Sequence, residues 1–250
     1  MQDNPSATAP LSQDCQVVEL RQYLLHPGGR DVLVELFDRE FVETQEAAGM
    51  RVIGQFRDMD NPDRFVWLRG FADMASRAKG LQAFYGGPVW AAHRDTANAT
   101  MVDSDNVLLL RPAWPGSAIA VRPQDRAPAG ATRPPAGVLD ATVFHLKRLP
   151  GAALFDFCRD RMTRVLREGG AKVLGWYVTE PAANNFPRLP VREGVNVLVG
   201  FALFEDAGTL ATFEASGRWQ RDVAPDLARW LAQPPEPLRL APTARSAIHA

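Results

Sequence analysis

The feature that most constrains the fold of this chain is an internal repeat, because two copies of one plan can bury each other's faces. Alternating, β-branched runs predict strands, and apolar residues three to four apart predict helices. In the first copy the predicted elements are, in order, a strand at 17–25, a helix from 33 to about 49, strands at 50–57 and 64–72, helical residues 74–99 broken at 86–88, and a strand at 106–111. The order is β-α-β-β-α-β.

The second copy follows the same order. Its predicted elements are a strand at 138–148, a helix over 155–166, strands at 172–179 and 195–204, helical segments at 207–216 and 219–232, and a short strand at 238–241. Single residues also correspond between the copies: Gly54 with Gly175, Phe71 with Phe204, Asp73 with Asp206 and Trp90 with Trp219. So many matches in the same order indicate a true repeat.

The repeat sets the domain organisation. We expect a disordered polar tail at 1–15, a first ferredoxin-like repeat at 16–112, a Pro/Ala/Gly-rich linker at 113–137 and a second ferredoxin-like repeat at 138–243. Several strands are apolar on both faces, which predicts burial on both faces. The predicted fold class is α+β, with two β-α-β-β-α-β repeats packed sheet to sheet as an intramolecular pseudo-dimeric α/β barrel.

Composition narrows the classes of partner. A net charge of −1 gives no bulk attraction to nucleic acid or to an anionic membrane. No stretch approaches the roughly 20 apolar residues that span a bilayer, and the first 15 residues do not read as a signal peptide. The two cysteines lie in unrelated contexts, which argues against a disulfide framework. We therefore expect a cytoplasmic protein that binds neither nucleic acid nor membrane.

Three motifs resemble the NIPSNAP family. They are VELRQY at 18–23 with the turn and Gly residues that follow, FYGGPVW at 84–90, and NNFPRLPVR at 184–192. The resemblance covers about residues 17–242. It implies a dimeric α/β-barrel fold of the kind found in small cofactor-free monooxygenases, some haem-binding and haem-degrading proteins, and lactone isomerases. It implies no settled reaction, and animal members of the family are discussed mainly as scaffolds.

A candidate site follows from strand alternation, if the two sheets enclose a cavity. The expected lining is Glu19, Arg21, Tyr23, Gln55, Trp67 and Arg69 from the first copy, with Thr142, Phe144, Leu146 and Trp176 from the second. Trp67 and Arg69 correspond to Gly200 and Ala202, so we expect a pocket inside the barrel, beside the first copy. The alternative is that the large side chains simply fill the space over the small ones.

Each role in this site has a structural alternative. Glu19 and Arg21 share a strand face and can form a buried ion pair that fixes the interior. The functional hypothesis makes Arg21 and Tyr23 the catalytic pair: Arg21 holds an enolate or carboxylate while Tyr23 donates a hydrogen bond. Substrate-binding residues would then be Glu19, Gln55, Trp67, Arg69, Phe144 and Trp176.

The leading functional hypothesis is binding of a small hydrophobic or aromatic molecule inside the barrel, with cofactor-independent oxygenation or isomerisation. The alternative is a non-catalytic binding or scaffold protein. A third hypothesis is haem binding through His93, which follows Trp90 by three residues on one predicted helix. No cofactor is otherwise implied, and no cluster has the spacing of a metal site. A homodimer formed through the exterior helices stays open.

Overall fold

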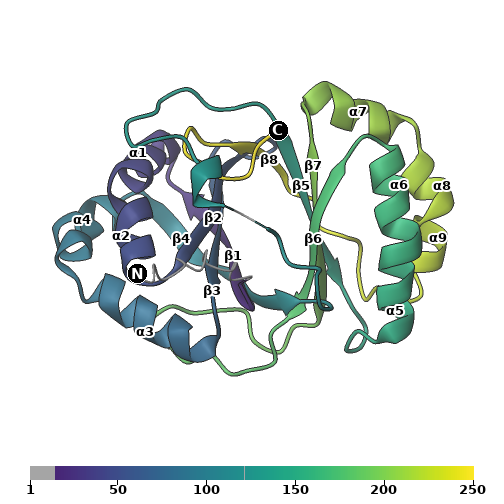
Figure 1. Cartoon of the computed structure of the whole chain (residues 1–250), viewed down its shortest axis with the longest axis horizontal. Helices are drawn as coiled ribbons and strands as arrows, with labels where there is room; N and C mark the ends of the chain where they lie inside the picture. The colour runs from purple at the N-terminus through teal and green to yellow at the C-terminus, as the bar shows by residue number, and fades with distance from the viewer. Residues whose placement is uncertain (1–14, 121) are drawn as a thin grey trace, which may run out of the picture.

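The structure is a computed structural model that describes residues 15–120 and 122–250. The predicted tail, apart from Cys15, lies outside the described residues. Figure 1 shows two β-α-β units side by side, with the strands of both in the centre and the helices on the two outer sides. The predicted fold class is confirmed.

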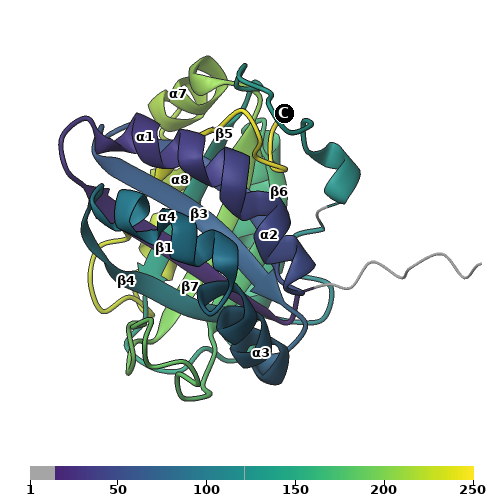
Figure 2. The same ribbon diagram turned by 90° about the vertical axis from the view of Figure 1, so that its left-hand side faces the viewer.

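The first repeat follows the predicted order. Its elements are β1 (Val17–Leu25), α1 (Gly29–Leu36), a π-helical turn (Phe37–Phe41), α2 (Val42–Ala47), β2 (Arg51–Asp58), β3 (Arg64–Phe71), α3 (Met74–Tyr85), α4 (Pro88–Asn98) and β4 (Met101–Pro112). Asp73 caps α3 by accepting a hydrogen bond from the Ser76 N–H at 2.7 Å. Figure 2 shows these helices covering one face of β1, β3 and β4.

The second repeat reproduces the first. After a 3-10 turn at Pro123–Asp125, its elements are β5 (Val138–His145), α5 (Ala152–Phe157), a π-helical turn (Cys158–Met162), α6 (Thr163–Glu168), β6 (Lys172–Thr179), β7 (Val197–Phe204), α7 (Ala207–Ala215), α8 (Arg218–Asp222), α9 (Ala224–Leu227) and β8 (Arg239–Pro242). Asp206 caps α7 as Asp73 caps α3. The first helix of each repeat ends at a glycine with positive φ, Gly49 (86°) and Gly170 (93°), a conformation that other residues rarely adopt.

All eight strands close one antiparallel barrel in the order β1-β3-β2-β8-β5-β7-β6-β4. Each repeat contributes a four-stranded ferredoxin-like sheet, and its last strand also pairs with the other repeat. Thus β4 pairs with both β1 and β6, and β8 pairs with both β5 and β2. These two symmetric junctions make the barrel a single body within one chain.

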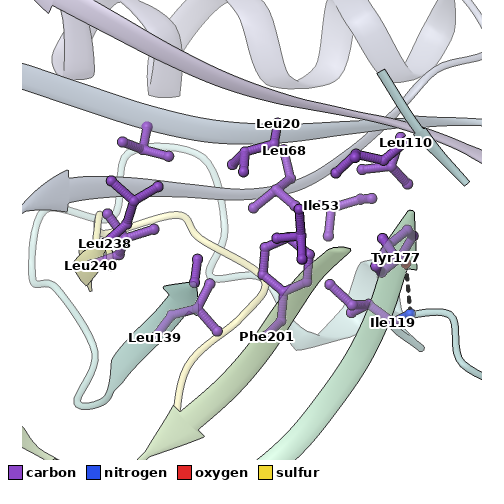
Figure 3. Close-up of a cluster of buried hydrophobic side chains, with 14 of the residues drawn as sticks. Leu20, Ile53, Leu68, Leu110, Ile119, Leu139, Tyr177, Phe201, Leu238 and Leu240 are labelled. Carbon is purple, nitrogen blue, oxygen red and sulfur yellow. Dashed lines mark hydrogen bonds between the residues drawn. The ribbon is translucent and has the colours of Figure 1, made fainter. Parts of the chain in front are cut away.

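The barrel interior is filled by aliphatic and aromatic side chains from both repeats. Figure 3 shows side chains from the two sheets and the adjoining segments pointing toward one another: Leu20, Ile53, Leu68, Leu110, Ile119, Leu139, Tyr177, Phe201, Leu238 and Leu240. These side chains are at most 7% exposed. The predicted cavity between the sheets is therefore wrong, and so is the predicted lining of the interior. The residues expected inside the barrel lie on the opposite sheet faces, beneath the helices.

The repeat extends past the limits seen in the sequence. Ser117 and Ile119, in the predicted linker, occupy the same places as Ser246 and Ile248 at the C-terminus. A side chain on Gly175 would come within 2.8 Å of the Ser117 carbonyl oxygen, and one on Gly54 within 3.1 Å of Ser246 Oγ. Ile119 and Ile248 both belong to the barrel core. The Ile119 N–H donates to the Tyr177 hydroxyl at 2.8 Å. Because β4 and β8 run in the same direction in the barrel, the segments that follow them leave at the same end, and each supplies an isoleucine to the core.

The filled barrel predicts a large effect of Phe201→Ala. Phe201 is fully buried and meets the ring of Tyr177 edge to face, with centroids 5.6 Å apart. Truncation leaves a cavity, so we expect the free energy of unfolding to fall by about 3–5 kcal/mol. Urea denaturation measures the loss. The control Leu149→Ala, at a side chain that is 76% exposed, should change stability by less than about 0.5 kcal/mol.

No helix within residues 15–120 and 122–250 is both long and apolar enough to cross a membrane.

Candidate functional site

Beneath the helices of the first repeat lies a buried group of charges, which we name the Glu19 cluster: Glu19, Arg21, Arg69 and Arg77. Glu19 Oε2 accepts from Arg69 Nη2 at 2.6 Å and from Arg21 Nη1 at 2.8 Å, while Glu19 Oε1 accepts from Arg77 Nε at 2.7 Å. All four side chains are 0–1% exposed. Glu19, Arg21 and Arg69 come from β1 and β3, and Arg77 reaches down from α3.

Neutral oxygens accept most of the remaining donors of the cluster. Arg21 Nε donates to the Tyr23 hydroxyl at 2.9 Å, and Arg69 Nη1 donates to Gln45 Oε1 at 3.0 Å. Arg77 Nη1 donates to Asn184 Oδ1 at 3.0 Å and to Asn185 Oδ1 at 2.7 Å, in a loop that crosses over from the second repeat. A polar face can be buried under helices here because the helices and the loop supply its partners.

The electrostatics of the cluster are dominated by this pairing. Burial by itself raises the pKa of a carboxyl, but Arg69, Arg21 and Arg77 hold the pKa of Glu19 well below its usual range. Glu19 is therefore ionised, and the four groups together carry two net positive charges. Burial raises the pKa of Tyr23, so its phenol is neutral and accepts a hydrogen bond from Arg21.

The corresponding layer of the second repeat is built differently. Strand register aligns Val17, which pairs with Phe71, with Val138, which pairs with Phe204. The same register gives the equivalent positions Glu19 and Asp140, Arg21 and Thr142, Tyr23 and Phe144, Trp67 and Gly200, Arg69 and Ala202, and Gln55 and Trp176. Arg77 corresponds to Leu210, since each lies four residues after the capping aspartate of its helix. Of the four charged residues of the Glu19 cluster, only Glu19 has a charged counterpart in the second repeat, Asp140.

The smaller residues leave a pocket of about 290 Å³ between the sheet and helices of the second repeat. We name it the second-repeat pocket. Its lining consists of Asp140, Thr142, Phe144, Leu166, Trp176, Gly200, Ala202, Leu210, Phe213, Glu214, Trp219, Gln220, Pro235, Pro237 and Arg239. A side chain on Gly200 would collide with the ring of Trp176 at 2.5 Å, so glycine lets that indole lie flat against the sheet.

The aromatic walls of the pocket are held in place. Trp219 stacks on Phe144 with centroids 6.1 Å apart and an interplanar angle of 25°. Trp176 Nε1 donates to Thr163 Oγ1 at 2.9 Å, which satisfies the polar atom of the buried indole. The space between these rings suits a planar, mainly apolar molecule.

Asp140 is the titratable group on the floor of the pocket. Its Oδ1 accepts a hydrogen bond from Thr142 Oγ1 at 2.8 Å. Burial raises the pKa of Asp140 from 3.8 to about 6, the Thr142 hydrogen bond opposes the rise, Glu214 adds to it and Arg239 opposes it. A carboxyl that titrates near neutrality can exchange a proton with a bound molecule.

This raised pKa predicts a pH-dependent stability difference between the protein and Asp140→Asn. Between about pH 4 and pH 6 the unfolded chain has ionised this carboxyl while the folded chain still holds its proton. Stability from this group therefore falls as the pH rises through that window. We expect Asp140→Asn to gain stability relative to the original protein between pH 4 and pH 7. Urea denaturation across that range measures the difference, and parallel pH profiles would contradict it.

The structure brings the sequence-predicted site residues together in two places and not in one. One group lies beneath the helices of the first repeat, where its side chains pair with one another and with neighbouring protein groups: Glu19, Arg21, Tyr23, Trp67 and Arg69. Gln55 lies in the same layer and donates to Asp38 Oδ1 at 3.1 Å. Phe144, Trp176 and Thr142 line the second-repeat pocket. Gly200 and Ala202 do leave space, but under their own helices and not beside the first repeat.

Sequence reasoning missed Asp140, Trp219, Glu214 and Arg239 as parts of a site. The alignment of Asp140 with Glu19, within the repeat itself, was the signal that could have found the carboxylate. Trp219 corresponds to Trp90 in the repeat, and Trp90 packs among Phe41, Phe84 and Tyr85.

His93 does not lie at either place. Its Nε2 is 3.7 Å from Glu40 Oε2, and its ring meets Phe41 edge to face. The second-repeat pocket has no histidine in its lining. Haem binding through His93 stays a prediction. Within the described part of the chain, no group of three or more His, Cys, Asp or Glu side chains is arranged to hold a metal ion.

Comparison with known proteins supports the fold and one family. The sequence model of the NIPSNAP family matches residues 18–114, which is the first repeat. The sequence matches no curated protein at a significant level.

The solved structures that resemble nearly the whole chain include the following three. One is a putative monooxygenase from Fusobacterium nucleatum, with 6% identity, a TM-score of 0.57 and coverage of 93% of this chain and 94% of that one. Another of the same description, from Lactobacillus acidophilus, has 11% identity, a TM-score of 0.56 and coverage of 93% and 98%. An anthrone oxidase-like protein has 12% identity, a TM-score of 0.55 and coverage of 96% and 98%. At these identities the likeness shows the shared two-repeat barrel alone.

Proposed function

We propose that this chain, whose first repeat is a NIPSNAP domain, binds a small, mainly aromatic molecule in the second-repeat pocket. The observation that carries the proposal is the difference between equivalent layers of the two repeats. In the first repeat the space above the carboxylate is filled by Trp67 and the guanidinium groups of Arg21 and Arg69. In the second repeat the Trp176 indole covers Gly200 in place of Trp67, but no side chain replaces the two guanidinium groups, and the space beside Thr142 and Ala202 is open.

The chemistry of the pocket supports binding of an aromatic ring beside a hydrogen-bonding group. Phe144, Trp176, Phe213 and Trp219 provide the apolar walls, and Asp140 provides an acceptor on the floor. An aromatic ring packed between such walls gains free energy from buried apolar area and from ring–ring contacts. Asp140 then fixes the orientation of the ring through whatever donor the ligand presents.

Asp140 is also the group best placed to act as an acid or base on the bound molecule. Cofactor-independent oxygenation is the second candidate function, favoured by the two-repeat barrel that this chain shares with the putative monooxygenases and the anthrone oxidase-like protein. In such a reaction a ring CH₂ of anthrone loses a proton to the Asp140 carboxylate and keeps the electron pair on carbon. Dioxygen accepts the electrons, and anthrone and O₂ become anthraquinone and water.

The oxygenase candidate has a direct test. Purified protein is mixed with anthrone in air-saturated buffer, and O₂ uptake and anthraquinone absorbance are followed. We expect turnover above the uncatalysed rate that Asp140→Asn lowers by about 10²–10⁴-fold, the usual contribution of a general base. Turnover that Asp140→Asn leaves unchanged would remove Asp140 from the reaction, and no turnover would remove oxygenation of this substrate.

The binding proposal is tested independently of turnover. Calorimetric titration with three probes of one skeleton, 2-phenylethylamine, 2-phenylethanol and 3-phenylpropionate, measures affinity for a ring with different end groups. We expect at least one probe to bind with one site per chain, and Ala202→Phe to abolish that binding by filling the pocket. The surface variant Leu149→Ala serves as the control. If no probe binds at millimolar concentration, the proposal fails.

A further inference from the structure

The first repeat shows what the space above the carboxylate holds when it is full. Three guanidinium groups meet Glu19 at 2.6–2.8 Å, and two of them also lie near the face of an indole. The guanidinium carbon of Arg69 is 4.9 Å from the ring centroid of Trp67, and that of Arg21 is 5.6 Å away. A buried carboxylate, cations and an aromatic ring thus form one stable arrangement at this position of the fold.

In the second repeat the carboxylate has lost all three cationic partners. Thr142, Ala202 and Leu210 stand where Arg21, Arg69 and Arg77 stand in the first repeat. Asp140 keeps only the hydrogen bond from Thr142 Oγ1. A largely buried carboxylate without a cation is costly, which is why its pKa rises.

Arg239 does not supply the missing charge. It is the cross-strand neighbour of Asp140 in the β5–β8 register. Its guanidinium group instead donates to Glu214 Oε1 at 3.0 and 2.8 Å and to both carboxylate oxygens of Asp60 at 3.2 Å. With Asp140 ionised, the carboxylates of Asp140, Glu214 and Asp60 and the guanidinium group of Arg239 together carry two net negative charges.

From this contrast we infer that the second-repeat pocket takes an organic cation, an ammonium or guanidinium group carried on a small aromatic or apolar body. The cation takes the place of the Arg69 and Arg21 guanidinium groups and pairs with Asp140. The rings of Trp176, Trp219, Phe144 and Phe213 enclose the rest, and their faces add cation–π attraction. The inference rests on the proposed binding site, and it holds whether or not the bound molecule is transformed.

The groups that face Asp140 fix the expected pH dependence. Thr142 on β5 and Ala202 on β7 are uncharged, Arg239 on β8 is engaged by Glu214 and Asp60, and Glu214 on α7 is itself acidic. The alkylammonium of 2-phenylethylamine stays protonated from pH 5 to pH 8. Its affinity is therefore expected to rise with pH as Asp140 ionises, while that of 2-phenylethanol changes little.

The test compares the three probes at pH 8 and pH 5 on the full chain and on Asp140→Asn. We expect 2-phenylethylamine to bind at least about 10-fold tighter than 2-phenylethanol at pH 8, with 3-phenylpropionate weakest. The advantage of the amine should vanish in Asp140→Asn, whose alcohol affinity stays within about 3-fold. Asp226→Asn, an exposed carboxylate outside the pocket, should alter neither affinity.

Each other outcome has a definite meaning. If the alcohol or the carboxylate binds as tightly as the amine, the organic-cation inference is overturned while the binding site stands. An amine preference that persists in Asp140→Asn also overturns it. If no probe binds, the proposed site itself fails. Circular dichroism of each variant shows whether it is folded, and Ala202→Arg, described below, provides a second variant that leaves Asp140 in place.

Discussion

Replacing Glu19 with Gln is expected to lower the free energy of unfolding by about 3–5 kcal/mol, because it leaves the guanidinium groups of Arg21, Arg69 and Arg77 buried without their anion. All four side chains are at most 1% exposed, so water cannot take the place of the carboxylate. Urea denaturation at pH 7 measures the loss. The pKa of Glu19 lies far below neutrality, so the original protein keeps this pairing across the ordinary pH range.

The matched control is Asp140→Asn, the same change at the equivalent position of the second repeat. Asp140 has no cationic partner of this kind, and removing its charge should leave the fold unharmed or more stable at pH 7. A loss below about 1 kcal/mol for Glu19→Gln, or equal losses for both variants, would contradict the difference drawn between the two layers.

The second large effect is expected from Ala202→Arg, which restores the arginine of the first repeat beside Asp140. Ala202 lines the pocket and pairs with Asp140 across β5 and β7, as Arg69 pairs with Glu19 across β1 and β3. The new guanidinium group should occupy the cation position and pair with Asp140. We expect the affinity for 2-phenylethylamine to fall at least about 100-fold, equivalent to roughly 2.7 kcal/mol.

Ala202→Gln separates charge from size in this experiment. Its side chain fills part of the same space without a positive charge, so it should weaken amine binding less than Ala202→Arg does. The two variants are compared by calorimetry at pH 8, with urea denaturation to show that both fold. Retention of amine binding in Ala202→Arg, or equal losses in both variants, would mean that Asp140 is not the anchor for a cation.

Most of the fold could be predicted from the sequence because the repeat is written in local patterns. The strands at Val17–Leu25 and Lys172–Thr179 begin and end where alternation predicts. Strand β4 (Met101–Pro112) is longer than predicted, because its first residues are mostly polar and are held in the strand by pairing with β1, which is a tertiary contact. The places of Ile119 and Ile248 in the core could not be predicted either, because they depend on where the segments after β4 and β8 lie in the folded barrel.

The candidate site was only partly predictable, because alternation separates two strand faces without saying which one faces the barrel. On β1 the sequence analysis predicts that the polar face of Glu19 and Arg21 lines the interior, which would leave the aliphatic face to the helices. The structure reverses this, since aliphatic faces from both sheets pack together without unpaired charges. Arg77, on the buried side of α3, is the residue that could have revealed where the charged face goes.

The sequence predicts a pocket next to Gly200 and Ala202, but it places that pocket inside the barrel, beside the first repeat. Gly200 and Ala202 were correctly seen as too small to fill the space over their strand. Their strand register places that space under α7 and α8 of their own repeat, next to Trp176 and Trp219. The small residues can be seen in the sequence, but which helices cover them can be seen only in the folded structure.

The most direct test is a crystal structure of the protein grown with 2-phenylethylamine at pH 8. A filled barrel and an open second-repeat pocket predict density for the probe between Trp176 and Trp219, with its ammonium group within hydrogen-bond distance of Asp140. Density inside the barrel, density at the Glu19 cluster, or an empty second-repeat pocket at saturating probe would contradict the placement of the site.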